Sequence, residues 1–148
     1  MFRQVTAQLW ASPQIEVGAV ARAKDMGIAL IINNRPEDES PDQTSGDDIS
    51  AAAAAAGLGY VAIPVTHAGF SEPQVSAMAA AIAGAQGGIL AYCRSGTRST
   101  LLWALAEAST GASPTDLAAA AAGAGYDLGS IAPLLDMLAA KSRDSGAK

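Results

Sequence analysis

The stretch "LAYCRSGTRSTLLW" (90–103) contains the single cysteine of the chain, Cys93, at the point where an apolar run gives way to polar residues. A short apolar run is typical of a strand buried on both faces. The residues from Arg98 to Ser109 have the composition of a helix. We therefore expect a strand, a tight loop that begins at Cys93, and a helix.

The same alternation of elements extends on both sides of this stretch. We expect strands at 5–10, 28–32, 60–65 and 89–92, and helices at 12–26, 47–59, 71–85, 98–109, from 113 onward, and at 131–140. Strands that alternate with helices predict an α/β fold, with a central, mainly parallel sheet of four to five strands flanked by helices. The length of 148 residues predicts one domain, 1–148, with a ragged polar tail from about residue 142.

The composition excludes several classes of function. The net charge of −5 argues against nucleic acid as a partner, because phosphate backbones need a basic surface. No apolar run is long enough to cross a membrane, and no signal peptide is evident. A single cysteine cannot form an internal disulfide. We therefore expect a cytoplasmic protein that contacts neither nucleic acid nor membrane.

The loop after the strand has the residues of an anion-binding cradle. Backbone N–H groups of the loop can turn inward, and the helix amino terminus adds positive potential. Hydroxyl donors come from Ser95, Thr97 and Ser99, whereas Arg98 offers a planar fork for an oxyanion. Gly96 permits backbone conformations that a side chain would forbid, and Arg94 adds charge.

Such surroundings favour a thiolate. Cysteines at helix amino termini have pKa values of roughly 3.5–7.5, against about 8.5 when free. Cys93 is therefore predicted to be a nucleophile inside an anion-binding loop. The alternative is a small, buried apolar residue without a chemical role, which is common for a lone cysteine.

The order of elements and the sequence "CRSGTRS" resemble the protein-tyrosine-phosphatase superfamily, whose loop is Cys, five residues, Arg, then Ser or Thr. More narrowly, "LWASPQ", "INNRPEDE", "YVAIPV", "SEPQV" and "LAYCRSGTRSTLLWAL" are similar to the bacterial family of beta-lactamase-hydrolase-like, phosphatase-like domains, from about Gln4 to Ala106. The resemblance implies a fold like that of dual-specificity phosphatases. It also implies a link to sulfur chemistry, since some members are described as sulfurtransferases and occur with sulfide-oxidising metallo-hydrolase-like proteins.

Three departures from the phosphatase pattern concern the site. Only four residues separate Cys93 from Arg98, and a Cys-x4-Arg loop resembles that of rhodaneses, which carry sulfur as a cysteine persulfide. Phosphatases of this fold have an aspartate general acid on an earlier loop, whereas the matching segment "THAGF" has only His67, and Glu72 is the nearest downstream acid. Tyr92 also replaces the histidine that many phosphatases have before the cysteine.

The sequence alone favours a sulfurtransferase. Cys93 would take the outer sulfur of thiosulfate or a glutathione persulfide, and with thiosulfate as donor sulfite would leave without an acid. Ser99 would stabilise the thiolate by donating a hydrogen bond, and no cofactor or metal is required. The resemblance adds a sulfide-oxidising metallo-hydrolase-like protein as a partner.

Two other functions remain open. The first is a phosphatase that acts through a Cys93 phosphoenzyme, with His67 or Glu72 as a substitute acid, although His67 could equally be a loop residue without a role. The second is a non-catalytic module that binds an oxyanion or a partner protein. Arg35 either adds charge to the pocket or holds its loop by pairing with Glu37 or Asp38.

Overall fold

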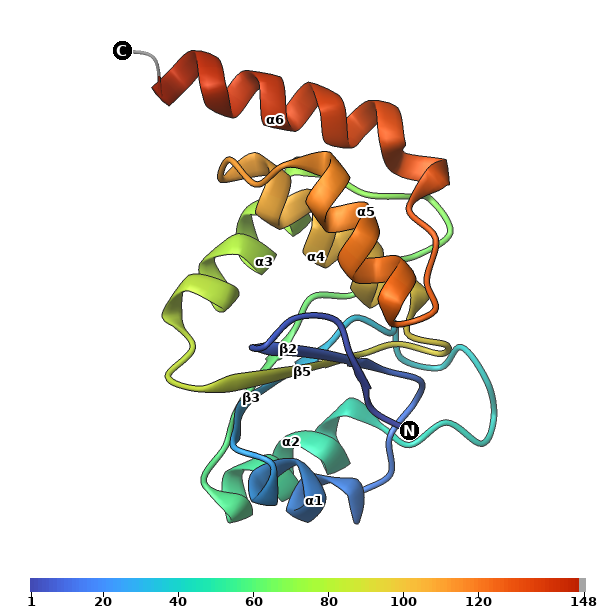
Figure 1. Cartoon of the computed structure of the whole chain (residues 1–148). Helices are drawn as coiled ribbons and strands as arrows, with labels where there is room; N and C mark the ends of the chain where they lie inside the picture. Colours follow the sequence, from blue (N-terminus) through green and yellow to red (C-terminus); the bar gives the residue numbers. More distant parts are fainter. Residues whose placement is uncertain (147–148) are drawn as a thin grey trace.

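A five-stranded sheet lies at the centre of the computed structural model, which describes residues 1–146 (Figure 1). The strands are β1 (Arg3–Gln4), β2 (Leu9–Ser12), β3 (Ile28–Asn33), β4 (Gly59–Ala62) and β5 (Gly88–Tyr92). They lie in the order β1-β2-β5-β3-β4, and all neighbours are parallel except β1 and β2. The predicted α/β class with a mainly parallel sheet is confirmed.

Helices cover both faces of this sheet. They are α1 (Ala19–Asp25), α2 (Gly46–Ala56), α3 (Glu72–Gly84), α4 (Thr97–Ser109), α5 (Pro114–Gly123) and α6 (Ala132–Gly146), with a short 3-10 turn at Gly129–Ile131. Figure 1 shows α1 and α2 on one face, and α3 and α4 on the other, with α5 and α6 packed outside α4. Each face has its own apolar cluster.

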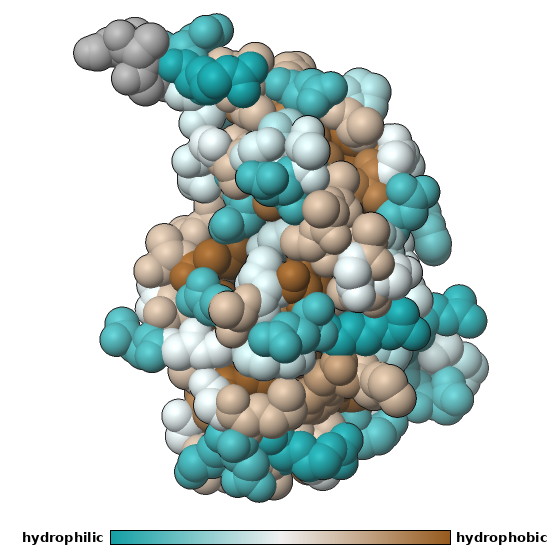
Figure 2. Space-filling model, viewed as in Figure 1, coloured by the Kyte–Doolittle hydropathy of each residue, from teal (hydrophilic) through white to brown (hydrophobic). Residues whose placement is uncertain are grey.

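Helix α4 is the most buried helix of the fold. Its residues from Ser99 to Ala106 are all buried, because strands lie on one side of it and α3, α5 and α6 on the others. In the view of Figure 2, hydrophilic residues are mixed with moderately hydrophobic ones over the surface, and the most hydrophobic residues are visible mainly in recesses. Within residues 1–146, no helix is both long and apolar enough to span a bilayer.

Local sequence signals place several helix ends correctly. Helix α2 begins where the Ser45 side chain accepts a hydrogen bond from the Asp48 N–H, and it ends at Gly57, whose φ is 80°. Helix α3 begins at a complete capping box formed by Ser71 and Gln74. The core between the layers consists mainly of Leu, Ile and Val side chains, with alanines among them.

The amino-terminal elements differ from the sequence prediction. The predicted strand at 5–10 is instead a turn followed by β2, because the Thr6 hydroxyl accepts hydrogen bonds from the N–H groups of Gln8 and Leu9. The helix predicted from Ser12 begins only at Ala19. Ser12 belongs to β2, and its hydroxyl donates to the Pro13 carbonyl instead of capping a helix.

Two further boundaries also differ. The strand predicted at 60–65 ends at Ala62, just before the proline at position 64. The last helix does not end at Ala140 but continues to Gly146, so the predicted ragged tail from about 142 is helical as far as residue 146. Residues 147–148 of that predicted tail lie outside the described residues.

Candidate active site

Cys93 lies directly after the central strand β5, at the carboxyl ends of the parallel strands. Its backbone N–H donates to the Ser12 carbonyl at 3.3 Å. Its sulfur is buried and accepts a hydrogen bond from the Gly96 N–H, at 3.1 Å. Because α4 begins at Thr97, the sulfur lies at the amino terminus of a buried helix, where a negative charge is favoured.

Gly96 makes the compact loop possible. Its φ is 94°, a conformation that side chains strongly disfavour. A Cβ at this position would also lie 2.2 Å from the Tyr126 hydroxyl oxygen. Glycine is therefore required here for two independent reasons, one in the backbone and one in the packing of Tyr126 against the loop.

The Arg98 guanidinium is held by one edge. Its Nη1 and Nη2 donate to the two carboxylate oxygens of Glu39 at 2.7 and 2.8 Å, and Nη1 also donates to the Val65 carbonyl at 2.7 Å. A guanidinium has five N–H donors, so this leaves the Nε–H and the Nη2–H next to it. Two donors on one edge of a guanidinium form a fork that can bind two oxygens of an oxyanion.

The charges of this pair stabilise each other. Hydrogen bonding to Glu39 raises the pKa of Arg98 above its usual value against the effect of burial, and the nearby Cys93 sulfur adds to the rise. The hydrogen bond from Arg98 lowers the pKa of Glu39 from 4.5 to about 2, with burial opposing and Arg35 assisting. Both groups are therefore charged at neutral pH, and the cation lies beside the sulfur.

Arg35 holds the polar loop after β3. This buried side chain donates from Nε to the Glu39 carboxylate at 2.9 Å, from Nη1 to the Gln14 side chain at 3.1 Å and from Nη2 to the Ser40 hydroxyl at 3.3 Å. With three partners, it positions Glu39 against Arg98. Of the two roles considered for Arg35, the geometry agrees with the one in which it holds its loop.

The predicted partners of Arg35, however, were wrong. Glu37 accepts instead from the Gly46 N–H at the start of α2, and Asp38 is exposed with a φ of 62°. The acid that pairs with Arg35 is Glu39, four positions later in the chain. The spacing of four residues lets the loop fold back on itself.

The remaining loop residues are arranged around the start of α4. Ser95 and Thr97 are exposed, and their hydroxyls lie 3.0 Å apart in a hydrogen bond. The Arg94 side chain is also exposed, whereas its carbonyl accepts from the Gln14 N–H at 3.3 Å. These residues thus shape the rim of the loop, and the Gly96 N–H is the loop amide that reaches the sulfur.

Ser99 does not make the predicted hydrogen bond to Cys93. Its hydroxyl is buried and has no hydrogen-bond partner among the described residues. The next residue, Thr100, donates its hydroxyl to the Gly96 carbonyl at 2.9 Å and so braces the loop from inside the helix. The sulfur accepts instead from the Gly96 N–H.

His67 lies on the loop that approaches Arg98. This loop follows β4, and the Val65 carbonyl at its start accepts from Arg98. The His67 side chain is exposed. No carboxylate occurs in the segment 63–71, so His67 is its only ionisable side chain.

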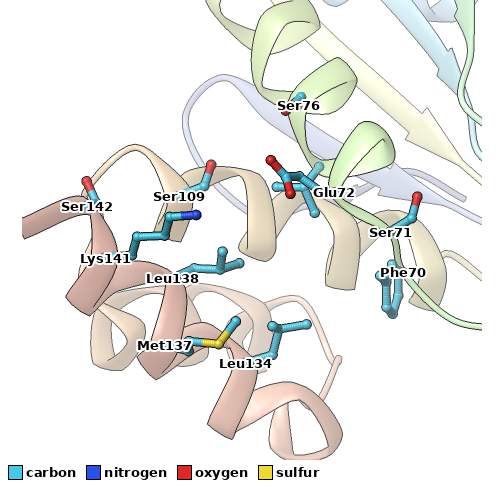
Figure 3. Close-up of a pocket in the computed structure, with 11 residues that line it drawn as sticks. Phe70, Ser71, Glu72, Ser76, Ser109, Leu134, Met137, Leu138, Lys141 and Ser142 are labelled. Carbon is cyan, nitrogen blue, oxygen red and sulfur yellow. The ribbon is translucent and has the colours of Figure 1, made fainter. Parts of the chain in front are cut away.

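Glu72 lines a groove between two helices. It lies at the start of α3, on a groove of about 430 Å³ between α3 and α6 (Figure 3). Lys141 lines the opposite side of this groove, and the residues from Cys93 to Ser99 do not line it. The role of Glu72 as a substitute acid or pocket residue therefore stays a prediction, and the structure places its side chain on this groove.

Tyr92 points away from the sulfur. Side chains alternate along a strand, and Tyr92 packs with the apolar cluster under α1 and α2. Burial raises the pKa of its hydroxyl, which finds no hydrogen-bond partner in residues 1–146. Tyr92 gives no direct support to a thiolate.

Sequence reasoning missed three residues that contact the site: Gln14, Glu39 and Tyr126. Glu39 lies in the polar loop 33–46, which holds several acidic residues, and no local pattern singles it out from them. Tyr126 lies 33 positions after Cys93 in the chain. No local pattern marks it, because it reaches the loop only through the packing of α5.

Within residues 1–146, no three side chains of His, Cys, Asp or Glu lie close enough to hold a metal ion. The groups that could bind a ligand at this site are the sulfur, the Gly96 amide and the free edge of Arg98. Donors placed beside a sulfur in this way can hold a tetrahedral oxyanion.

Residues 1–110 match the model of a family described as "Beta-lactamase hydrolase-like protein, phosphatase-like domain". The chain belongs to this family. A beta-lactamase hydrolase-like protein of Xylella fastidiosa is 41% identical over 104 residues, which are 70% of this chain and 24% of that protein. The chain thus spans about a quarter of the length of the curated relatives it matches.

Solved structures share the fold of this phosphatase-like domain. A Neisseria meningitidis protein described as a candidate phosphatase is 31% identical, with a TM-score of 0.80 over 92% of this chain and 96% of that one. Human DUSP28 is 19% identical, with a TM-score of 0.62 over 98% and 99% of the two chains. The fold predicted from the loop is therefore confirmed as phosphatase-like.

Proposed function

We propose that this chain is a cysteine-dependent phosphatase that hydrolyses phosphate monoesters. The family and the N. meningitidis relative support this class of reaction more than sulfur transfer, which the sequence alone favoured. The observation that carries the proposal is the geometry of Arg98. Glu39 occupies one edge of its guanidinium and leaves a two-donor fork next to the Cys93 sulfur.

The reaction proceeds in two displacements at phosphorus. The Cys93 thiolate attacks the phosphorus of the ester, a sulfur–phosphorus bond forms, and the bond to the leaving oxygen breaks with its electron pair. Water then attacks the phosphocysteine, which releases inorganic phosphate and restores the thiolate. Arg98 stabilises the phosphoryl oxygens in both steps, while the Gly96 N–H donates to the sulfur.

The leaving group determines the substrate class. An alkoxide needs a proton from the enzyme, whereas an aryl oxide leaves more readily as an anion. General acid catalysis contributes about 10²–10⁴-fold where it operates. Since segment 63–71 offers only an exposed histidine, we expect aryl phosphates to be the better substrates.

Sulfur transfer is the second candidate, and the same segment favours it. In this reaction the thiolate bonds to the outer sulfur of thiosulfate, the sulfur–sulfur bond of the donor breaks, and sulfite leaves with the electron pair. No proton is needed, so the absence of a carboxylic acid from segment 63–71 costs nothing. The four-residue spacing between Cys93 and Arg98 also resembles that of rhodaneses, which transfer sulfur.

One comparison of purified variants decides between the two. The chain is assayed for phosphate release from 4-nitrophenyl phosphate, and for thiocyanate formation from thiosulfate and cyanide. Cys93→Ser should abolish phosphate release, and Arg98→Lys should weaken it strongly because lysine has no fork. Arg143→Lys, on an exposed position of α6, is the matched control and should leave the rate unchanged.

Each result has a distinct meaning. Phosphate release that depends on Cys93 and Arg98 supports the phosphatase. Thiocyanate without phosphate release, with a mass gain of one sulfur atom on Cys93, contradicts it and supports the sulfurtransferase. No turnover in either assay, with sulfate still protecting Cys93 from alkylation, contradicts both and leaves an anion-binding module.

A further inference from the structure

Tyr126 lies against the outer side of the Cys93 loop. It is buried, and it follows the carboxyl end of α5, where its N–H donates to the Ala121 carbonyl at 2.9 Å. Its hydroxyl donates to the Ser95 carbonyl at 3.3 Å. The loop packs so tightly against this hydroxyl that only a glycine fits at position 96.

The Ser95 carbonyl and the Gly96 N–H belong to the same peptide group. In a trans peptide the C=O and N–H bonds point in opposite directions in one plane. Tyr126 binds the oxygen of this group, and the N–H on its other side donates to the Cys93 sulfur at 3.1 Å. One rigid peptide thus connects the tyrosine hydroxyl to the nucleophile.

We propose that Tyr126 is a positioning residue that strengthens the hydrogen bond from the Gly96 N–H to the Cys93 sulfur. By fixing the carbonyl, it prevents the peptide from rotating and presenting its oxygen to the sulfur. By withdrawing electron density from the carbonyl, it also polarises the N–H, as hydrogen bonds in chains do. Both effects favour the thiolate, and they deepen the proposed function, on which the catalytic consequence rests.

The position of Tyr126 is itself fixed. The Arg3 guanidinium lies over its ring, 5.5 Å from the centroid, and donates to the Ala124 carbonyl at 3.2 Å. Burial raises the pKa of the Tyr126 hydroxyl, with Arg3 opposing and Cys93 assisting, so this group remains a donor at neutral pH. The charged groups beside Tyr126 and Cys93 are therefore Arg3 and Arg98, and Glu39 is paired with Arg98.

The test measures the pH dependence of Cys93 alkylation by iodoacetamide in the absence of any substrate. Tyr126→Phe should raise the pH midpoint by about 0.5 to 1 unit, the value of one modest hydrogen bond. Tyr60→Phe is the control, since the Tyr60 hydroxyl accepts from the Asn33 side chain and contacts the other apolar cluster. The midpoint of this control should not move.

A second measurement covers the case in which Tyr126→Phe weakens the fold. Hydrogen exchange of the Gly96 amide should become faster in the variant, whereas the Thr100 amide, bonded to the Gly96 carbonyl in α4, should not change. An unchanged midpoint with unchanged Gly96 exchange overturns the proposal, as does an equal rise in Tyr60→Phe. Neither the alkylation midpoint nor the amide exchange rate depends on turnover. Both can therefore be interpreted even if the chain does not hydrolyse phosphate esters.

Discussion

The Glu39 carboxylate binds both terminal nitrogens of Arg98, although the two residues are 59 positions apart in the chain. The loop after β3, which holds Glu39, thereby fixes the Arg98 guanidinium beside the Cys93 loop that follows β5. A bidentate pair of this kind restricts rotation of the guanidinium plane. The free edge of Arg98 is therefore oriented before any ligand arrives, which reduces the ordering cost of binding an oxyanion.

Glu39→Gln should lower kcat/KM for an aryl phosphate by about 100-fold, the order expected when a catalytic group is displaced by about 1 Å. The amide keeps the size of the side chain but loses the charge and one acceptor. The measurement is steady-state kinetics with 4-nitrophenyl phosphate. Asp38→Asn is the control, because Asp38 is exposed one position earlier and asparagine tolerates its positive φ. Equal loss in both variants would refute a specific role of Glu39.

The stability of the chain should depend on pH through Glu39. The pKa of Glu39 is lowered from 4.5 to about 2 in the folded chain, so its pairing stabilises the fold above pH 4.5 and this contribution is lost as the pH falls toward 2. Urea unfolding of the wild type and of Glu39→Gln should therefore differ most near neutral pH. The two free energies of unfolding should converge on acidification, and a constant difference would contradict the pairing.

Gly96→Ala should destabilise the chain by more than about 1 kcal/mol, since alanine at a positive φ is strained, and the added methyl group would also collide with Tyr126. Gly57→Ala separates the two causes, because Gly57 has a φ of 80° but an added Cβ there would meet no atom within 4 Å. Thermal unfolding of both variants measures the difference. A Gly96→Ala protein no less stable than Gly57→Ala would show that the loop does not pack against Tyr126.

Glu72→Gln should leave the rates with all substrates unchanged, because Glu72 lines the groove between α3 and α6 instead of the site. A loss of activity in Glu72→Gln would mean that Glu72 affects the reaction at Cys93 from its position on the groove.

His67→Ala should slow an alkyl phosphate more than an aryl phosphate if its imidazole protonates the leaving oxygen. Initial rates with phenyl phosphate, 4-nitrophenyl phosphate and an alkyl phosphate distinguish these effects.

The loop from Cys93 to Arg98 and the surrounding α/β order could be read from the sequence because both depend on local signals. Apolar β-branched runs marked the strands, and Ser71 with Gln74 marked the start of α3. The start of α1 was misplaced because Ser12 followed by proline reads locally as a helix cap. The pairing of β2 with β5 instead extends Ser12 as a strand, and this contact is not local.

The partners of the site residues could not be read in the same way. Glu39 was one of several acids in a polar loop, and only the fold shows that it reaches Arg98. Tyr126 contacts the Cys93 loop through the end of α5, which no spacing rule connects to it. Sequence patterns thus located the nucleophile, whereas the groups that hold it in place depend on tertiary packing.

The most direct test of the account is the covalent state of Cys93 during turnover. The chain is mixed with excess 4-nitrophenyl phosphate and quenched rapidly in denaturant, and the Cys93 peptide is then analysed by mass spectrometry. We predict a phosphoryl group on Cys93 that forms with the burst of nitrophenol and disappears as substrate is exhausted. Nitrophenol release from a chain whose Cys93 stays unmodified, or release that persists in Cys93→Ser, would contradict the account.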